Sequence, residues 1–142
     1  MSKGYRELPH TADVYLEVYA PSLNEAFEQA GVALFDVMTD ISSVDAKLST
    51  SFKIEAEDLY SLLFEYIREL LFLVDTEECL FKDFNVEIKN DNDKYKLYAT
   101  VKGEKIDFNK HRLKTEIKAP TYAQMEILTS EKQVVLRFVV DI

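Results

Sequence analysis

The stretch DLYSLLFEYIRELLFLV, residues 58–74, constrains the fold more than any other part of the chain. Its apolar residues recur at helical spacing and form one broad stripe: Leu59, Leu62, Leu63, Tyr66, Ile67, Leu70, Leu71 and Val74. A helix with such a stripe must bury it against another element or another molecule. The pattern therefore predicts an amphipathic helix that covers a β-sheet, with a dimerisation face as the alternative.

A second helix is predicted earlier in the chain, over residues 22–39. Ser22 and Glu25 have the spacing of a capping box. The apolar residues that follow recur at helical spacing: Leu23, Phe27, Ala30, Leu34, Val37 and Met38. Each of the two helices is preceded by a segment in which apolar residues alternate, 13–20 and 48–57, and this alternation is typical of a strand with one face in the core.

The remainder of the chain reads as β structure. Residues 84–90 and 94–103 flank the polar turn NDND, and residues 121–129 and 133–142 flank SEK, so each pair predicts a hairpin. The segment 104–120 between them is less regular. Late hairpins argue against a doubly wound parallel sheet, and a length of 142 residues suits one domain over 1–142. We expect an α+β fold, a two-layer domain with two main helices packed on a mixed, largely antiparallel β-sheet.

The charge of the chain limits the partners it can bind. Lys plus Arg number 17 and Asp plus Glu number 26, which gives a net charge of -9. Such a surface disfavours direct tight binding to nucleic acid, although it suits a basic protein partner. Cys79 is the one cysteine, which fits a reducing compartment. No apolar run approaches the roughly 20 residues of a membrane helix, so we expect a cytoplasmic protein without a membrane association.

Two polar clusters could carry chemistry. His10, Thr11 and Asp13 lie together where a loop enters the first predicted strand, and they offer a nitrogen, a hydroxyl and a carboxylate. Asp107 and His111 lie in the irregular segment IDFNKHR. Each cluster has a simpler interpretation, as local hydrogen bonding to the backbone or as a polar loop. There is no glycine-rich phosphate loop, Ser-His-Asp context or paired-cysteine zinc signature, so a nucleotide-binding enzyme is not indicated.

The last residues, LRFVVDI, form a third candidate. Alternation places Phe138 and Val140 on the core face of a strand and Asp141 on the opposite face, next to the carboxylate of Ile142. Ends of domains are usually poorly ordered. A terminus held in a sheet would present Asp141 and the terminal carboxylate as a compact cluster of oxygen atoms.

Four stretches taken together resemble the archease family. They are HTAD at 10–13, LLFEYIRELLFLVDTE at 62–77, DFNKHRLKTEIKAPTY at 107–122 and the terminal VVDI, in the order of the family and over nearly the whole chain. The resemblance implies a non-catalytic protein that assists an RtcB-type RNA ligase in tRNA splicing and RNA repair. In that role it promotes guanylylation of the ligase histidine and multiple turnover, while the ligase itself uses GTP and a divalent metal.

The resemblance also implies a metal site. The matching ligands are Asp13, Asp141 and Ile142, and the metal is expected to be Ca²⁺, with Mg²⁺ or Mn²⁺ as alternatives. Two aspartates and a terminal carboxylate would repel one another unless a hard cation neutralised them, and such cations prefer oxygen ligands. The residues that could support this site are His10, Thr11, Asp107 and His111.

The chain departs from the family where KAVTYH is common and KAPTYA stands at 118–123. Pro120 replaces a valine and Ala123 replaces a histidine, so any role of that histidine is absent or moved here. Two other functions remain open. One is a small metal-dependent hydrolase using His10, Asp13, His111 and Asp141, against which the missing substrate-phosphate motifs count. The other is a chaperone-like binding module with a structural metal.

Overall fold

The computed structural model describes residues 2–9 and 13–142. Its elements follow one another as β1 (Gly4–Leu8), β2 (Val14–Ala20), α1 (Leu23–Met38), the short 3-10 helix η1 (Ile41–Ser43), β3 (Leu48–Ala56), α2 (Leu59–Glu77), β4 (Cys79–Asp91), β5 (Lys94–Lys105), β6 (Ala119–Pro120), β7 (Glu126–Thr129) and β8 (Val134–Asp141). No helix of the described ranges is long and apolar enough to cross a membrane.

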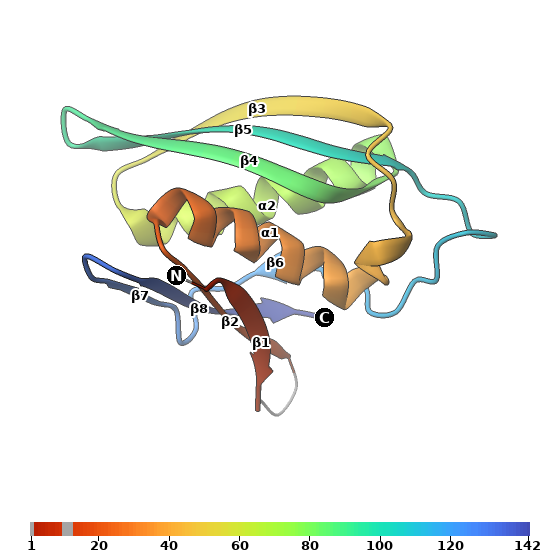
Figure 1. Ribbon diagram of the computed structural model, residues 1–142, viewed down its shortest axis with the longest axis horizontal. Helices are drawn as coiled ribbons and strands as arrows, with labels where there is room; N and C mark the ends of the chain where they lie inside the picture. The colour runs from red at the N-terminus through yellow and green to blue at the C-terminus, as the bar shows by residue number, and fades with distance from the viewer. Residues whose placement is uncertain (1, 10–12) are drawn as a thin grey trace.

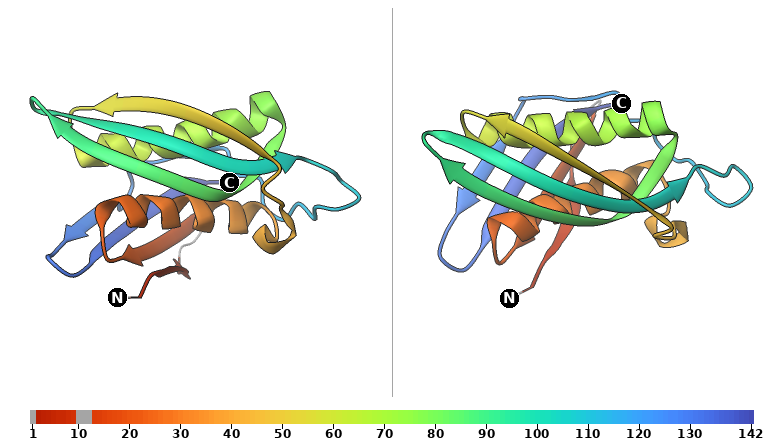
Figure 2. Two further views of the ribbon diagram at one scale, coloured as in Figure 1. Left: turned by 45° about the horizontal axis from the view of Figure 1, so that its top comes forward. Right: turned by 90° about the horizontal axis from the view of Figure 1, so that it is seen from above.

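The strands form two sheets with the helices between them (Figure 1). One sheet has the order β1-β2-β8-β6, with β7 also paired to β8, and the other has the order β3-β5-β4. The two further views in Figure 2 show the same three layers. The α+β class with two helices packed on antiparallel sheets is confirmed. The strands divide into two sheets where one was expected, so the helices form a middle layer instead of an outer one.

Both helices begin where the sequence predicts. The Ser22 hydroxyl accepts a hydrogen bond from the Glu25 amide at 3.2 Å, as in a capping box. The Asp58 carboxylate caps α2 by accepting from the Ser61 amide at 2.7 Å. The second helix runs to Glu77, three residues beyond its predicted end.

Both predicted hairpins are confirmed. Strands β4 and β5 are joined by Asn92 and Asp93, which have φ values of 49° and 67°. Asn and Asp tolerate this left-handed conformation, which a two-residue hairpin turn requires. Strands β7 and β8 pair through Ile127 and Leu136. Strand β1 was not expected, because exposed charged residues such as Arg6 and Glu7 hide its alternation.

Side chains of α1 cover the free edge of β4 and so tie the middle layer to the smaller sheet. The Glu28 carboxylate accepts a hydrogen bond from the Val86 amide at 2.8 Å, and the Asn24 amide oxygen accepts one from the Ile88 amide at 2.9 Å. These amides would otherwise be unpaired, because β4 lies at the edge of its sheet. Burial beside this edge raises the pKa of Glu28.

Tyr66 of α2 lies at the centre of the core, and its hydroxyl yields a first prediction. The ring packs near Phe27 and Phe52, with centroid separations of 5.5 and 6.3 Å. The hydroxyl is fully buried and has no hydrogen-bond partner among residues 2–9 and 13–142. Burying an unpaired hydroxyl costs about 1–3 kcal/mol. We therefore expect Tyr66→Phe to raise the free energy of unfolding by about 1 kcal/mol in urea titration.

The control for this prediction is Tyr66→Ala, which removes the ring as well as the hydroxyl. It should lower the free energy of unfolding by about 3–5 kcal/mol because it leaves a cavity. A Tyr66→Phe variant less stable than the wild type would mean that the hydroxyl makes a stabilising contact.

Candidate functional site

Two aspartates from opposite ends of the sequence meet where β2 and β8 pair. These strands are antiparallel, with Val14 opposite Val140 and Leu16 opposite Phe138. Continuing this register by one residue places Asp13 opposite Asp141. The fold therefore brings Asp13, Asp141 and the adjacent Ile142 to the same end of the larger sheet.

Burial and pairing fix the backbone at this end of the sheet. Val14 and Val140 are buried, whereas Asp141 is exposed just beyond them. On its other side Asp141 pairs with Ala119 of β6, and its carbonyl accepts a hydrogen bond from the Lys118 amide at 2.8 Å. The main chain of Asp141 is thus held by β6, one residue beyond the last pair of β8 with β2, while its side chain is exposed to solvent.

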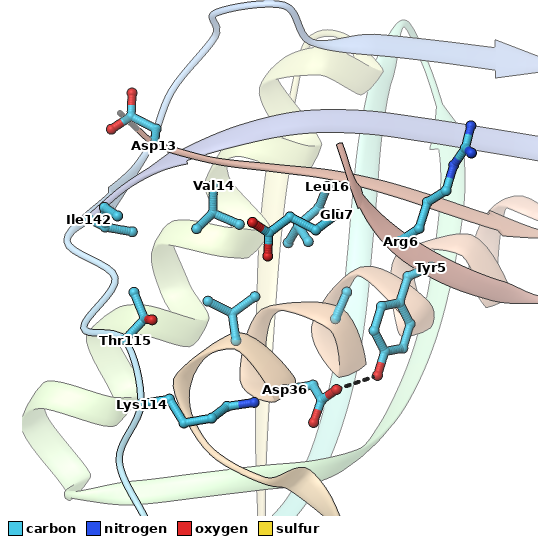
Figure 3. A pocket seen from close by; sticks show the side chains of 12 residues that line it. Tyr5, Arg6, Glu7, Asp13, Val14, Leu16, Asp36, Lys114, Thr115 and Ile142 are labelled. Carbon is cyan, nitrogen blue, oxygen red and sulfur yellow. Dashed lines mark hydrogen bonds between the residues drawn. The ribbon is translucent and has the colours of Figure 1, made fainter. Parts of the chain in front are cut away.

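Asp13 and Ile142 also line one cavity of about 620 Å³. Figure 3 shows them at one end of it and Tyr5 and Asp36 at the other. The two ends differ in their hydrogen bonding. The Tyr5 hydroxyl donates to the Asp36 carboxylate at 2.7 Å, and together with burial this contact raises the pKa of Tyr5 to about 12. The walls come from β1, β2, α1 and the segment 114–115.

The carboxylates of the two aspartates differ from that of Asp36, which the Tyr5 hydroxyl contacts. Within the described parts of the chain, the side chains of Asp13 and Asp141 form no hydrogen bond and no ion pair. In those same ranges no group of three or more His, Cys, Asp or Glu side chains could hold a metal ion. The predicted ligand set of Asp13, Asp141 and Ile142 contains only two such side chains, and its third member is the carboxylate of Ile142. Such a donor set consists only of hard oxygen atoms, which suits Ca²⁺ or Mg²⁺.

His10 and Thr11 lie outside the described residues. Several residues that line the cavity were not picked out from the sequence, among them Tyr5, Lys114 and Thr115. Tyr5 belongs to the strand that alternation did not reveal, and the other two belong to an irregular segment. No local pattern identifies these residues, because only the packing of distant segments brings them together.

Asp107 and His111 belong to a separate cluster. The imidazole Nδ1 of His111 accepts a hydrogen bond from the Asp107 amide at 2.9 Å, so this nitrogen carries no proton. The other ring nitrogen then donates to the Glu104 carboxylate at 2.9 Å. His111 is only 2% exposed. Asp107 lines a different cavity, which shares no lining residue with the cavity of Asp13.

Glu104 is the centre of that second cluster. It is buried, and its carboxylate accepts hydrogen bonds from the Lys110 ammonium at 2.7 Å and the Asp45 amide at 2.8 Å, besides the one from His111. These contacts, led by the one from Lys110, lower the pKa of Glu104 to about 2. The ionised carboxylate thus joins the loop at 45–47 to the loop at 107–111.

This lowered pKa predicts a loss of stability in acid. A glutamate in the unfolded chain titrates near pH 4.3, so the stabilisation from Glu104 is complete above about pH 5 and is lost as the pH falls towards 2. We expect the free energy of unfolding in urea to fall over this range, and Glu104→Gln to be less stable near neutrality with a smaller fall. The control Glu7→Gln changes an exposed carboxyl group and should keep the wild-type slope. Equal slopes for wild type and Glu104→Gln would contradict the assignment.

The two positions that depart from the family pattern lie in and just after β6, the strand that pairs with the end of β8. Pro120 is buried in β6 opposite Val140. Proline lacks an amide proton, and a short edge strand tolerates this. Ala123 is exposed, and its amide donates to the Thr121 hydroxyl at 3.2 Å. A histidine at this exposed position would add a polar side chain that the alanine lacks.

Comparisons with known proteins agree with this architecture. The chain matches the Archease protein family (MTH1598/TM1083) over residues 5–142. It is 45% identical over 133 residues to protein archease of Sulfurisphaera tokodaii, covering 94% of each chain. It is 43% identical over 125 residues to protein archease of Pyrococcus abyssi, covering 88% of each.

Solved structures show the same fold. The solution structure of Methanobacterium thermoautotrophicum protein 1598 has a TM-score of 0.86 and 38% identity, covering 98% of this chain and 99% of its own. The crystal structure of a Thermotoga maritima archease, described as a "possible chaperone", has a TM-score of 0.62 at 19% identity and shares the fold. With a family match from Tyr5 to Ile142 and relatives at 43% and 45% identity, the chain belongs to the archease family.

Proposed function

We propose that this protein is a non-catalytic, cytoplasmic activator of an RtcB-type RNA ligase in tRNA splicing and RNA repair. It binds a divalent cation through Asp13, Asp141 and the carboxylate of Ile142, and it presents that cation to the ligase. In this role it promotes guanylylation of the ligase histidine and repeated turnover. The observation that supports the proposal is the antiparallel register of β2 and β8, with Val14 opposite Val140, because its extension by one residue would put Asp13 opposite Asp141 and beside Ile142.

The donor set supports Ca²⁺ as the metal, with Mg²⁺ or Mn²⁺ as alternatives. Three carboxylates supply up to three negative charges, and the affinity for calcium rises with the charge of the ligands. Three protein groups do not fill the six to eight positions that Ca²⁺ takes, so positions stay open for water or for groups of the partner. When bound, the cation would supply positive charge for phosphate oxygens.

In this proposal Asp13 and Asp141 hold the cation in a fixed position. Asp141 pairs with Ala119 of β6, and the preceding residue, Val140, pairs with Val14 of β2. Asp13 stands at the start of β2, where Val14 is buried and anchors the strand. A rigid backbone at both positions lets the carboxylates converge without a large loss of conformational entropy on binding.

The alternative function, a metal-dependent hydrolase, is less well supported because His111 is not available as a catalytic group. It requires His111 as a base or ligand, yet both ring nitrogens of His111 are engaged inside the second cluster. The other residues of this alternative are Asp13, Asp141 and His10, and His10 lies outside the described residues.

A guanylylation assay of the ligase tests the proposal. The purified ligase is incubated with GTP and metal, with and without this protein, and the covalent ligase-guanylate is measured over time. We expect faster guanylylation and multiple rounds of RNA joining with the protein, and no joining by the protein alone. An unchanged rate with saturating protein would refute the proposal.

A further inference from the structure

The outer side of α2 carries a row of exposed aromatic side chains. Tyr60 and Phe72 are 44% and 56% exposed. Between them Phe64 stacks on Tyr122, with ring centroids 4.3 Å apart and an interplanar angle of 4°. Residues four apart share one side of a helix. We call these four residues the α2 ridge. Exposed aromatic groups gathered in this way mark interaction surfaces.

The same helix carries most of the net charge of the protein. Residues 57–78 contain one basic residue, Arg68, and seven acidic ones: Glu57, Asp58, Glu65, Glu69, Asp75, Glu77 and Glu78. Seven negative charges and one positive charge give -6, whereas the whole chain has -9. Arg68 lies in the row between Phe64 and Phe72 and pairs with the Glu65 carboxylate, and the other acidic residues leave the helix with an excess of negative charge that is complementary to a basic partner.

The stability of the helix explains the acidic groups at its N-terminus, where Asp58 caps it, but not those at its C-terminus. Asp75, Glu77 and Glu78 stand at the C-terminus of α2, and its last turn has no basic residue. Carboxylates at this end are unfavourable because the helix dipole is negative there. Glu78 is also in the left-handed region, with φ of 52°. The Lys105 ammonium donates to the Glu77 carbonyl at 2.5 Å and offsets only part of this cost.

An apolar hollow of about 340 Å³ adjoins the C-terminal half of α2. Its lining includes Leu71, Val74, Leu80, Leu113 and Ile117. Asp75 stands at its rim, and it lies one helical turn from Phe72. The hollow therefore continues the α2 ridge and offers a place for an apolar side chain of a partner.

The hollow and the ridge both reach the candidate metal site. Lys114 and Thr115 line the hollow and also the cavity of Asp13 and Ile142. At the other end α2 packs against β6, whose Ala119 pairs with Asp141. Figure 2 shows the C-terminus and α2 along the same side of the molecule. A partner that reaches the metal site therefore lies next to the α2 ridge.

We propose that the α2 ridge and the apolar hollow form the docking surface for a basic protein surface that inserts one apolar side chain. This proposal rests on the proposed function for the identity of that partner, the RNA-binding side of the ligase. RNA-binding surfaces are basic, so they match the charge of α2. A second copy does not match it, because a two-fold dimer through this face would bring two helices of charge -6 together.

Two substitutions on α2 test the surface. Phe72→Ala removes an exposed ring and Asp75→Lys reverses a charge at the rim of the hollow. Neither should destabilise the fold, and Asp75→Lys places a cation at the favourable end of the helix. Tyr98→Ala and Glu87→Lys are matched controls, because both residues are exposed on strands of the smaller sheet.

The affinity of each variant for the ligase is measured by titration calorimetry at several salt concentrations. We expect Phe72→Ala to weaken binding at least about tenfold, since exposed aromatic residues are common hot spots. Asp75→Lys should weaken binding at low salt and reduce its salt dependence, because charges are screened over about 8 Å at physiological ionic strength. The two control variants should bind like the wild type, and all variants should keep the wild-type affinity for Ca²⁺.

The guanylylation assay separates this proposal from the proposed function. At saturating concentration both α2 variants should reach the wild-type rate, although more protein is needed. Unchanged affinity of the α2 variants, with activation intact, would overturn the docking surface alone. A wild-type dimer in sedimentation that Phe72→Ala dissociates would also overturn it, because a second copy would then cover the ridge. A wild type that binds the ligase without stimulating it would refute only the proposed function.

Discussion

Replacing Asp13 by alanine should abolish the stimulation of the ligase while the protein stays folded. Asp13 lies just before the buried Val14, and its carboxylate makes no contact within residues 2–9 and 13–142 that the fold would lose. The substitution removes one of the three proposed metal ligands, and with it one of up to three negative charges at the proposed metal site. Altering residues that merely support a metal ligand costs 10–100-fold in affinity, so loss of the ligand itself should cost about 100-fold or more.

Calcium titration calorimetry and the guanylylation rate measure this effect. Glu7→Ala is the matched control, because Glu7 lines the same cavity from β1 and is not a proposed ligand. It should retain both metal binding and stimulation. If Asp13→Ala stimulated the ligase normally, Asp13 would only terminate the strand, and the proposed metal site would be wrong.

Extending the chain beyond Ile142 offers a second way to perturb the same site. An added residue turns the terminal carboxylate into a neutral amide carbonyl, which keeps one oxygen and loses a full negative charge. Calcium affinity should fall because it depends on ligand charge. An extension before Met1 serves as the control. Equal metal binding and activation by the two extended forms would show that the carboxylate of Ile142 is not a ligand.

Replacing Gly103 by alanine should have the largest effect on stability. An added Cβ would lie 1.8 Å from the carbonyl oxygen of Leu80 and 2.7 Å from the Cα of Phe81. Both are main-chain atoms of the neighbouring strand β4, close to its register shift between Phe81 and Asp83, so they cannot rotate away. Overpacking that forces backbone shifts costs about 3 kcal/mol or more, and we expect Gly103→Ala to be strongly destabilised or unfolded.

Gly4→Ala is the control for the prediction on Gly103→Ala. Its Cβ would meet the hydroxyl of Tyr19 at 2.8 Å, which is the far end of a flexible side chain. This variant should unfold in urea within about 1 kcal/mol of the wild type. Wild-type stability of Gly103→Ala would contradict the close approach of β4 and β5 at this position.

The sequence by itself determined the elements whose signals are local. The spacing of apolar residues over 22–39 and 58–74 predicted α1 and α2, and the caps at Ser22 and Asp58 fix where they begin. Alternation and the polar turn residues predicted both late hairpins. These features follow from the periods of helix and strand and from the conformational preferences of single residues, so they need no information about distant contacts.

Only the tertiary structure decided how those elements combine. Alternation shows that a strand has a buried face but not which strand lies beside it, so the division into two sheets and the position of β1 could not be foreseen. The register of β2 and β8 then brings the ends of the strands next to Asp13 and Asp141 together, with Val14 opposite Val140, whereas Asp107 and His111 join Glu104 in a separate cluster. Pairing between distant segments depends on the packing of the whole core, because a shift of one residue would turn every buried side chain of a strand towards solvent.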